Sequence, residues 1–185
     1  MTLPIGNPPP PAERRRMVTV GLARALVIVT GLTVGYYLTP LDVMTAVPLW
    51  LSLTAGVLTL VAVTASQVRA IIRAPHPAAR AVLAVAIIVP LFVLLFAAAY
   101  FLLSQADASN FNQQSLNRTD TLYFTMTVFA TVGFGDITAV SQTARVVVTI
   151  QMILDLIVLG ALIRVLLGAV HLGRQRPDHR ANEPS

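Results

Sequence analysis

One six-residue stretch of the sequence has the residue types that could bind a cation through its backbone. It reads Thr131-Val132-Gly133-Phe134-Gly135-Asp136. The two glycines can adopt positive φ angles that other residues avoid, so alternating them with larger residues lets successive carbonyl oxygens point to the same side. A row of carbonyls that faces an axis can replace the water around a cation. The stretch therefore predicts a lining for a dehydrated cation.

The segment before this stretch predicts a helix that is too short to cross a bilayer. The apolar run 122–132 is preceded by Thr119 and Asp120, either of which can cap a helix over residues 119–130. A membrane span needs about 20 residues, so this helix must enter and return on one side. Irregular backbone at membrane depth persists only where it is buried in protein or lines a wet cavity. A plain glycine-containing turn is the alternative, and the long apolar segment that follows argues against it.

The composition predicts that the elements around this stretch lie in a membrane. The chain has 185 residues, of which 56% are hydrophobic and 11% charged, whereas a soluble domain has about 25% charged residues. Four apolar segments are long enough to span, at residues 17–39, 47–72, 81–103 and 144–170. The predicted fold is an all-α membrane protein with four transmembrane helices and one re-entrant helix. The sequence contains no cysteine, which excludes disulfides, thiolate catalysis and cysteine-based metal sites.

Arginine residues are grouped in three places that predict the orientation. They precede the first segment, flank the turn between the second and third, and follow the fourth: Arg14, Arg15, Arg16, Arg69, Arg73, Arg80, Arg174, Arg176 and Arg180. By the positive-inside rule these ends face the cytoplasm. We expect residues 1–16 and 173–185 to be cytoplasmic, the first of them disordered, and we expect no nucleic-acid partner despite the net charge of +5.

The stretch 131–136 resembles the selectivity filter of the tetrameric potassium-channel superfamily. Residues 80–172 resemble the two-helix pore domain of that family, with an outer helix, a pore helix at 119–130, the filter at 131–136 and an inner helix at 144–170. The resemblance implies a homotetramer in a lipid bilayer. Within the family, the chain resembles a small bacterial member with four spans, located in the plasma membrane. Residues 17–79 would then form two peripheral transmembrane helices.

The resemblance also implies roles for particular residues. Potassium ions would be bound by the backbone carbonyls of the first four filter residues and by the hydroxyl of the first: Thr131, Val132, Gly133 and Phe134. Gly135 and Asp136 would complete the outer mouth, and the filter would be supported by Tyr123, Phe124 and Thr127. Potassium is the permeant ion, and no cofactor is expected.

Several positions differ from the usual pattern of that family. Phe134 lacks the hydroxyl of the tyrosine often found there, and Ala130 replaces a threonine. Thr127 stands where some members carry a buried carboxylate. Asp155 lies near the usual place of a hinge glycine in the inner helix.

Asp155 lies in the middle of the fourth apolar segment, where an unpaired carboxylate facing lipid costs several kcal/mol. The favoured interpretation is a wet cavity below the filter, in which four copies form an acidic ring. The alternative is a structural bond to another helix, for example through Arg24. Candidate gate residues follow on the same helix: Leu159, Gly160, Leu162 and Leu166.

The function expected from these observations is passive, potassium-selective conduction. A weakly selective cation channel and a non-conducting accessory membrane subunit are the alternatives. A membrane-embedded enzyme is not expected, because the sequence lacks a His, Cys or carboxylate cluster with the spacing of a metal or nucleophile site. The sequence does not predict the stimulus that opens the pore.

Overall fold

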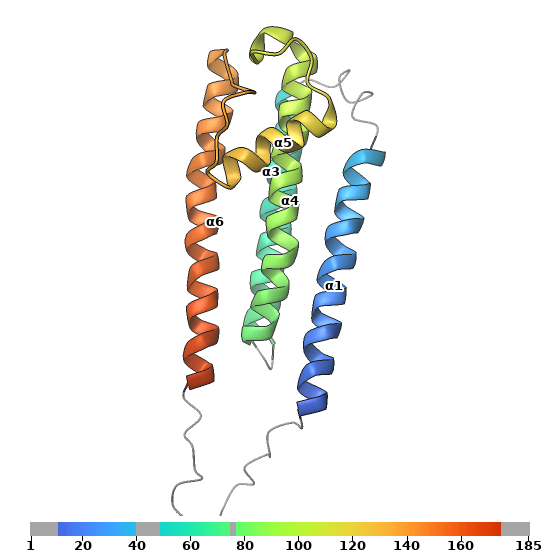
Figure 1. Ribbon diagram of the computed structural model, residues 1–185, viewed down its shortest axis with the longest axis vertical. Coiled ribbons are helices and arrows are strands. Elements are labelled where there is room, and N and C mark those ends of the chain that lie inside the picture. Colours follow the sequence, from blue (N-terminus) through green and yellow to red (C-terminus); the bar gives the residue numbers. More distant parts are fainter. Residues whose placement is uncertain (1–10, 40–48, 75–76, 175–185) are drawn as a thin grey trace, which may run out of the picture.

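Five α-helices and one short 3₁₀ helix make up the described part of the chain (Figure 1). The computed structural model describes residues 11–39, 49–74 and 77–174. The elements are α1 (Pro11–Leu38), α3 (Leu49–Ile72), α4 (Pro77–Ala106), η1 (Ala108–Asn110), α5 (Arg118–Phe129) and α6 (Gln142–Arg174). Within these ranges, extended pairing is limited to one antiparallel bridge between Phe111 and Ala139.

Four of the helices are long and apolar enough to cross a membrane. The candidate spans are Thr19–Leu38, Trp50–Ile72, Arg80–Ala106 and Gln142–Arg164. Each overlaps one of the predicted apolar segments. Helix α5 has only 12 residues, well short of the length that a span requires. The predicted all-α membrane fold with four transmembrane helices is confirmed, and the chain is a multi-pass membrane protein.

Three of the four long helices begin earlier than predicted, and one of them is α4, which begins at Pro77 where residue 81 is predicted. Helix α1 begins at Pro11, so residues 11–16 are helical and not disordered. Proline is tolerated there because the first helical residues have no intrahelical use for their N–H groups. Helix α6 begins at Gln142, since the Ser141 hydroxyl caps it by accepting the Ala144 N–H at 3.1 Å. Residues 1–10 and 175–185, predicted to be cytoplasmic, lie outside the described residues.

Helix α4 is the centre of the molecule, because α1, α3, α5 and α6 all pack against it. In Figure 1, α5 crosses obliquely over α4, from the side of α1 toward α6, and α1 and α6 stand on opposite sides of α4. A core cluster joins α4, α5, α6 and the loops between them: Tyr100, Leu103, Phe111, Leu116, Phe124, Ile137, Ala144 and Val148. Burial of these side chains holds the short helix in place between two long ones.

The start of α5 differs from the prediction. Its N-cap is Asn117, whose side-chain oxygen accepts the N–H groups of Thr119 and Asp120 at 2.8 and 2.9 Å. Asp120 is the third helical residue, and its carboxylate accepts the Asn117 N–H at 2.9 Å. The two residues therefore form a capping box, in which each satisfies a backbone donor of the other. Asp120 takes part in the cap from within the helix, and Thr119 supplies only a backbone N–H.

Candidate functional site

The residues 131–136, here called the carbonyl loop, leave the end of α5 through a tight turn. The Thr127 carbonyl accepts the N–H groups of Val132 at 2.9 Å and Gly133 at 3.2 Å. The Thr127 hydroxyl, which is buried, donates to the Phe124 carbonyl at 2.8 Å. Thr127 therefore holds the base of the carbonyl loop with its backbone, and its side chain is engaged within α5.

Alternate residues of the carbonyl loop have left-handed backbone angles. The φ angle is +56° at Thr131, +56° at Gly133 and +79° at Gly135. The two glycines thus have the positive φ that the sequence predicts. The positive φ of Thr131 is not predicted, because a β-branched residue is rarely found in that region. The alternation is the pattern that a row of carbonyls on one side of the chain requires.

The carbonyl loop is exposed in the single chain. Phe134 is 68% exposed and Val132 is 53% exposed, although the helices on either side are packed. A cation needs oxygen ligands on all sides to replace its water shell, and one chain supplies only one row. The exposed loop of one chain therefore cannot surround a cation by itself.

The last residue of the carbonyl loop, Asp136, is held by amide side chains from the segment after α4. The Asp136 carbonyl accepts Asn112 Nδ2 at 2.9 Å and Gln113 Nε2 at 3.2 Å. Asn112 also pairs with Thr138, accepting its N–H at 2.8 Å and donating its own backbone N–H to the Thr138 carbonyl at 3.1 Å. Sequence reasoning missed these supports. The amide-rich run 110–114 was the available signal, since amide side chains both donate and accept.

The two aromatic residues predicted to support the filter lie in different places. The rings of Tyr123 and Phe134 stack with centroids 6.2 Å apart and an interplanar angle of 1°. Interaction of the Tyr123 hydroxyl with the Asp136 carboxylate raises the pKa of Tyr123. Phe124 instead lies in the core, edge-on to the Tyr100 ring at 5.1 Å. Of these two aromatic residues, Tyr123 contacts the carbonyl loop, whereas Phe124 packs α5 against α4.

Asp155 lies in a buried polar network between three helices. Gln151 Nε2 donates to the Asp155 carboxylate at 3.4 Å and to the Thr125 carbonyl at 3.3 Å. The Gln151 carbonyl oxygen accepts the Tyr100 hydroxyl at 2.5 Å. Asp155 is only 6% exposed, and within the described residues its Oδ1 atom has no hydrogen-bond partner. Its partner is thus Gln151 of its own helix, and the predicted alternative of a bond to Arg24 is not found.

A hollow of about 150 Å³ lies between the base of the carbonyl loop and α6. It is lined by Val128, Phe129, Thr131, Met152, Asp155, Leu156 and Leu159. The structure therefore brings Thr131, Asp155 and the gate candidate Leu159 to one hollow. Gly160 is exposed and Leu162 half-buried further along α6. The side chain of Leu166 lies outside the part of the chain that the structure describes.

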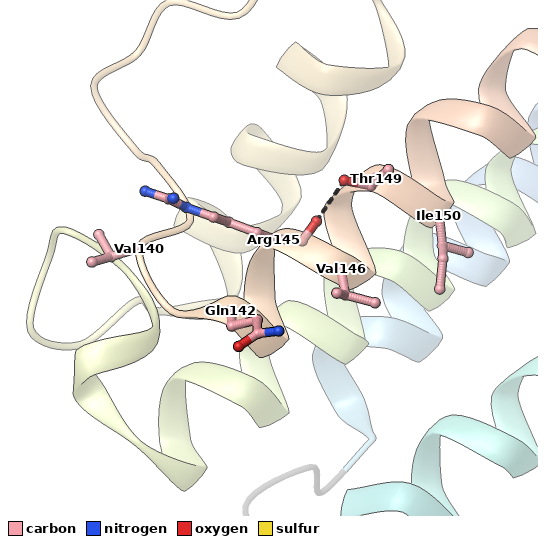
Figure 2. A pocket seen from close by; sticks show the side chains of 6 residues that line it. All are labelled: Val140, Gln142, Arg145, Val146, Thr149 and Ile150. Atoms are coloured by element: carbon pink, nitrogen blue, oxygen red, sulfur yellow. Dashed lines mark hydrogen bonds between the residues drawn. The ribbon is translucent and has the colours of Figure 1, made fainter.

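A second, wider hollow lies on α6 near its start (Figure 2). Its lining residues are Val140, Gln142, Arg145, Val146, Thr149 and Ile150. Arg145 Nε donates to the Ala139 carbonyl at 3.2 Å, and the Thr149 hydroxyl donates to the Arg145 carbonyl at 2.8 Å. In the described residues, no group of three or more His, Cys, Asp or Glu side chains could hold a metal ion.

The sequence around the carbonyl loop matches a known family. A family model described as "Ion channel" matches residues 88–171. The match indicates an ion channel. It points to a transport role and not to a catalytic one, and it covers most of α4, the whole of α5, the carbonyl loop and most of α6. No curated protein and no solved structure matches the chain.

Proposed function

We propose that the protein is a potassium-selective channel that conducts K⁺ passively. The observation that carries this proposal is the alternation of positive φ at Thr131, Gly133 and Gly135, at the end of a helix too short to span. Such a backbone can aim consecutive carbonyl oxygens at one axis, which is how K⁺ filters replace the water shell of the ion. The carbonyls of residues 131–134 and the Thr131 hydroxyl bind the ion, and Asp136 lies at the outer mouth.

The conducting form is a homotetramer. One chain offers a single row of carbonyls on an exposed loop, and four copies around an axis complete the rings. The carbonyl loop lies in one half of the molecule, beside the first turns of α6, and the first residues of α1 and the last of α6 lie at the opposite end (Figure 1). With the arginine pattern, this arrangement supports cytoplasmic termini. The membrane we propose is the plasma membrane of a bacterium.

Below the carbonyl loop, Asp155 attracts cations into a wet cavity. The support is the hollow that Asp155 shares with Thr131, together with the carboxylate oxygen that has no hydrogen-bond partner in the described chain. A buried charge without a partner is costly, and water or a cation in the cavity would stabilise it. Further along α6, apolar side chains for a constriction are supplied by Leu159, Leu162 and Leu166. Gly160 lies among them and has no side chain.

The reversal potential tests the proposal. The full chain is reconstituted in planar bilayers with K⁺ on one side and Na⁺ on the other. A reversal potential near the K⁺ equilibrium value is the expected result. Clear current that reverses near zero would show a weakly selective cation channel instead, with Phe134 as the first position to examine. Absence of current, together with a monomer in detergent, would favour a non-conducting accessory subunit.

A further inference from the structure

The guanidinium group of Arg118 joins the end of α1 to the beginning of α5. Its Nη1 atom donates to the carbonyl oxygens of Tyr36, Tyr37 and Thr39 at 3.0, 2.7 and 2.7 Å. These carbonyls belong to the C-terminal end of α1, where the last carbonyl groups of a helix have no intrahelical partner. Arg118 therefore caps a helix that lies some 80 residues before it in the chain.

The tyrosine hydroxyls of α1 make the reciprocal bonds to α5. The Tyr36 hydroxyl donates to the Arg118 carbonyl at 2.9 Å and lies 3.0 Å from the Thr121 hydroxyl. The Tyr37 hydroxyl lies 3.1 Å from the Thr119 hydroxyl. Tyr36 is 7% exposed, so its bonds are shielded from competing solvent. The first turn of α5 is thus bound to α1 by bonds in both directions.

The charge of Arg118 is explained by α1 and not by its own helix. Arg118 is the first residue of α5, and a positive charge at a helix N-terminus is opposed by the helix dipole. The C-terminal end of α1 carries the opposite partial charge and favours a cation. The Arg118 guanidinium also lies 5.5 Å from the centroid of the Phe101 ring, within the range of a cation–π contact.

An apolar cluster lies beneath the hydrogen bonds between the end of α1 and the beginning of α5, and it stabilises them. Tyr36 packs with Leu94, Ala97 and Phe101 of α4, and Leu122 of α5 packs against the same cluster. Three helices therefore meet at one point, where Arg118 satisfies the polar groups above the apolar cluster. Displacement of α1 from this point would break hydrogen bonds and expose apolar surface at the same time.

Helix α5 connects this point directly to the carbonyl loop. The helix has 12 residues and is capped at its start by Asn117, and its last turn contains the Thr127 carbonyl that accepts the N–H groups of Val132 and Gly133. A capped helix of three turns is stiff, so a movement of its first turn also moves its last turn.

We infer that Arg118 is a positioning residue, through which α1 sets the placement of α5 and thereby the conduction through the carbonyl loop. The inference rests on the proposed function, because it requires a loop that conducts. It gives α1 a role that the pore helices alone do not have. A shift of α1 in the bilayer therefore reaches the carbonyl loop through α5.

The test is the open probability of single channels formed by the full chain in planar bilayers containing K⁺. Arg118→Gln removes the charge and most of the donors, and we expect a loss of open probability of roughly tenfold, equivalent to about 1.4 kcal/mol. Arg118→Lys keeps the charge but lacks the planar fork of donors. We expect its open probability to lie between those of Arg118→Gln and the unsubstituted protein. Thr33→Val is the matched control, because the Thr33 hydroxyl bonds only within α1, to the Val29 carbonyl at 2.9 Å.

A chemical link separates positioning from a merely structural role. The sequence has no cysteine, so Tyr37→Cys with Thr119→Cys introduces the only two thiols. A reducible bifunctional thiol reagent that spans the length of a tyrosine side chain then ties α1 to α5. In the Arg118→Gln background, we expect linking to restore the open probability and reduction to remove it again.

Two results would overturn the inference alone. In the first, the unsubstituted protein conducts and Arg118→Gln has the same open probability. In the second, linking α1 to α5 in the Arg118→Gln protein does not raise the open probability. If Arg118→Gln reduces assembly, Tyr36→Phe replaces it: a lowered open probability supports the inference, and an unchanged one overturns it. Absence of current from the unsubstituted protein would instead overturn the proposed function, and the inference with it.

Discussion

Thr131 combines a β-branched side chain with a left-handed backbone, which costs about 1–2 kcal/mol relative to the ordinary conformation. The hydrogen bonds around it explain why the conformation persists. The Thr131 N–H donates to the Val128 carbonyl at 2.9 Å, and the next two N–H groups donate to Thr127. The backbone at the base of the carbonyl loop is therefore held from α5, and Thr131 extends the alternation that the two glycines begin.

Gly133→Ala tests the alternation directly. No atom lies within 4 Å of the place that a Cβ would take, so the cost is strain at a φ of +56° and not a collision within the chain. We expect the backbone to rearrange and the permeability ratio of K⁺ to Na⁺ to fall roughly tenfold, for a strain of about 1.4 kcal/mol. The measurement is the reversal potential with K⁺ and Na⁺ on opposite sides.

Gly56→Ala is the control for that substitution. It adds the same methyl group to helix α3, where the nearest side-chain atom belongs to Leu95 at 3.7 Å, an ordinary contact. Its reversal potential should equal that of the unsubstituted protein. An unchanged reversal potential in Gly133→Ala would contradict the role given to the backbone angles.

Asp155→Asn tests the charge below the carbonyl loop. The amide keeps the shape and the bond to Gln151 but removes the charge, so we expect internal Mg²⁺ to block the current less strongly, by about tenfold in affinity. The measurement is the Mg²⁺ dependence of outward current. Asp107→Asn is the control, because Asp107 caps η1 directly after α4 and does not line the hollow that contains Asp155. Equal Mg²⁺ block in Asp155→Asn and in the unsubstituted protein would place the charge outside the cavity.

At the scale of the elements, the capping box gives α5 a defined first turn. Asn117→Ala removes the acceptor for two N–H groups, which costs about 1 kcal/mol. We expect the melting temperature of the detergent-solubilised protein to fall by about 2–4 °C. Ser115→Ala, at an exposed position of the same loop, is the control and should melt with the unsubstituted protein. Identical melting of the two variants would show that the cap contributes nothing.

The elements differ in how far the sequence predicts them. Hydropathy is a property of a whole segment, so the four spans and the short helix follow from it directly. The cap of α5 is missed because three of the four residues 117–120 can each cap a helix, and only the chain path selects Asn117. The bonds between Arg118 and the end of α1 have no local signal, since they join residues about 80 positions apart.

The carbonyl loop shows the same limit within the candidate site. Its glycines predict the positive φ angles at 133 and 135, whereas Thr131 acquires its angle from hydrogen bonds that only the folded turn provides. Tyr123 and Phe124 are neighbours in sequence, yet about 100° of helical rotation sends one to the loop and the other to the core. The sequence thus predicts the helical segments and the glycine positions, whereas the contacts of single side chains depend on the folded structure.

At the scale of the whole molecule, the two ends of the helical bundle should face different compartments. Single cysteines can report this, because the chain has none of its own. We expect Ser115→Cys, in the loop beside the carbonyl loop, to react with a membrane-impermeant thiol reagent on intact cells. We expect Ala74→Cys, in the turn after α3, to react only after the cells are opened. The reverse pattern would contradict cytoplasmic termini.

The buried network around Gln151 has a mechanical consequence for α6. Both ends of the Gln151 amide are engaged, by Tyr100 of α4 and by the Thr125 carbonyl of α5. Beyond Asp155, none of the residues 156–164 is buried in the chain. Helix α6 is thus bonded to its neighbours near Gln151 and has no buried side chain over the residues 156–164. We therefore expect α6 to bend in the part beyond Asp155 and to stay in place beside the carbonyl loop.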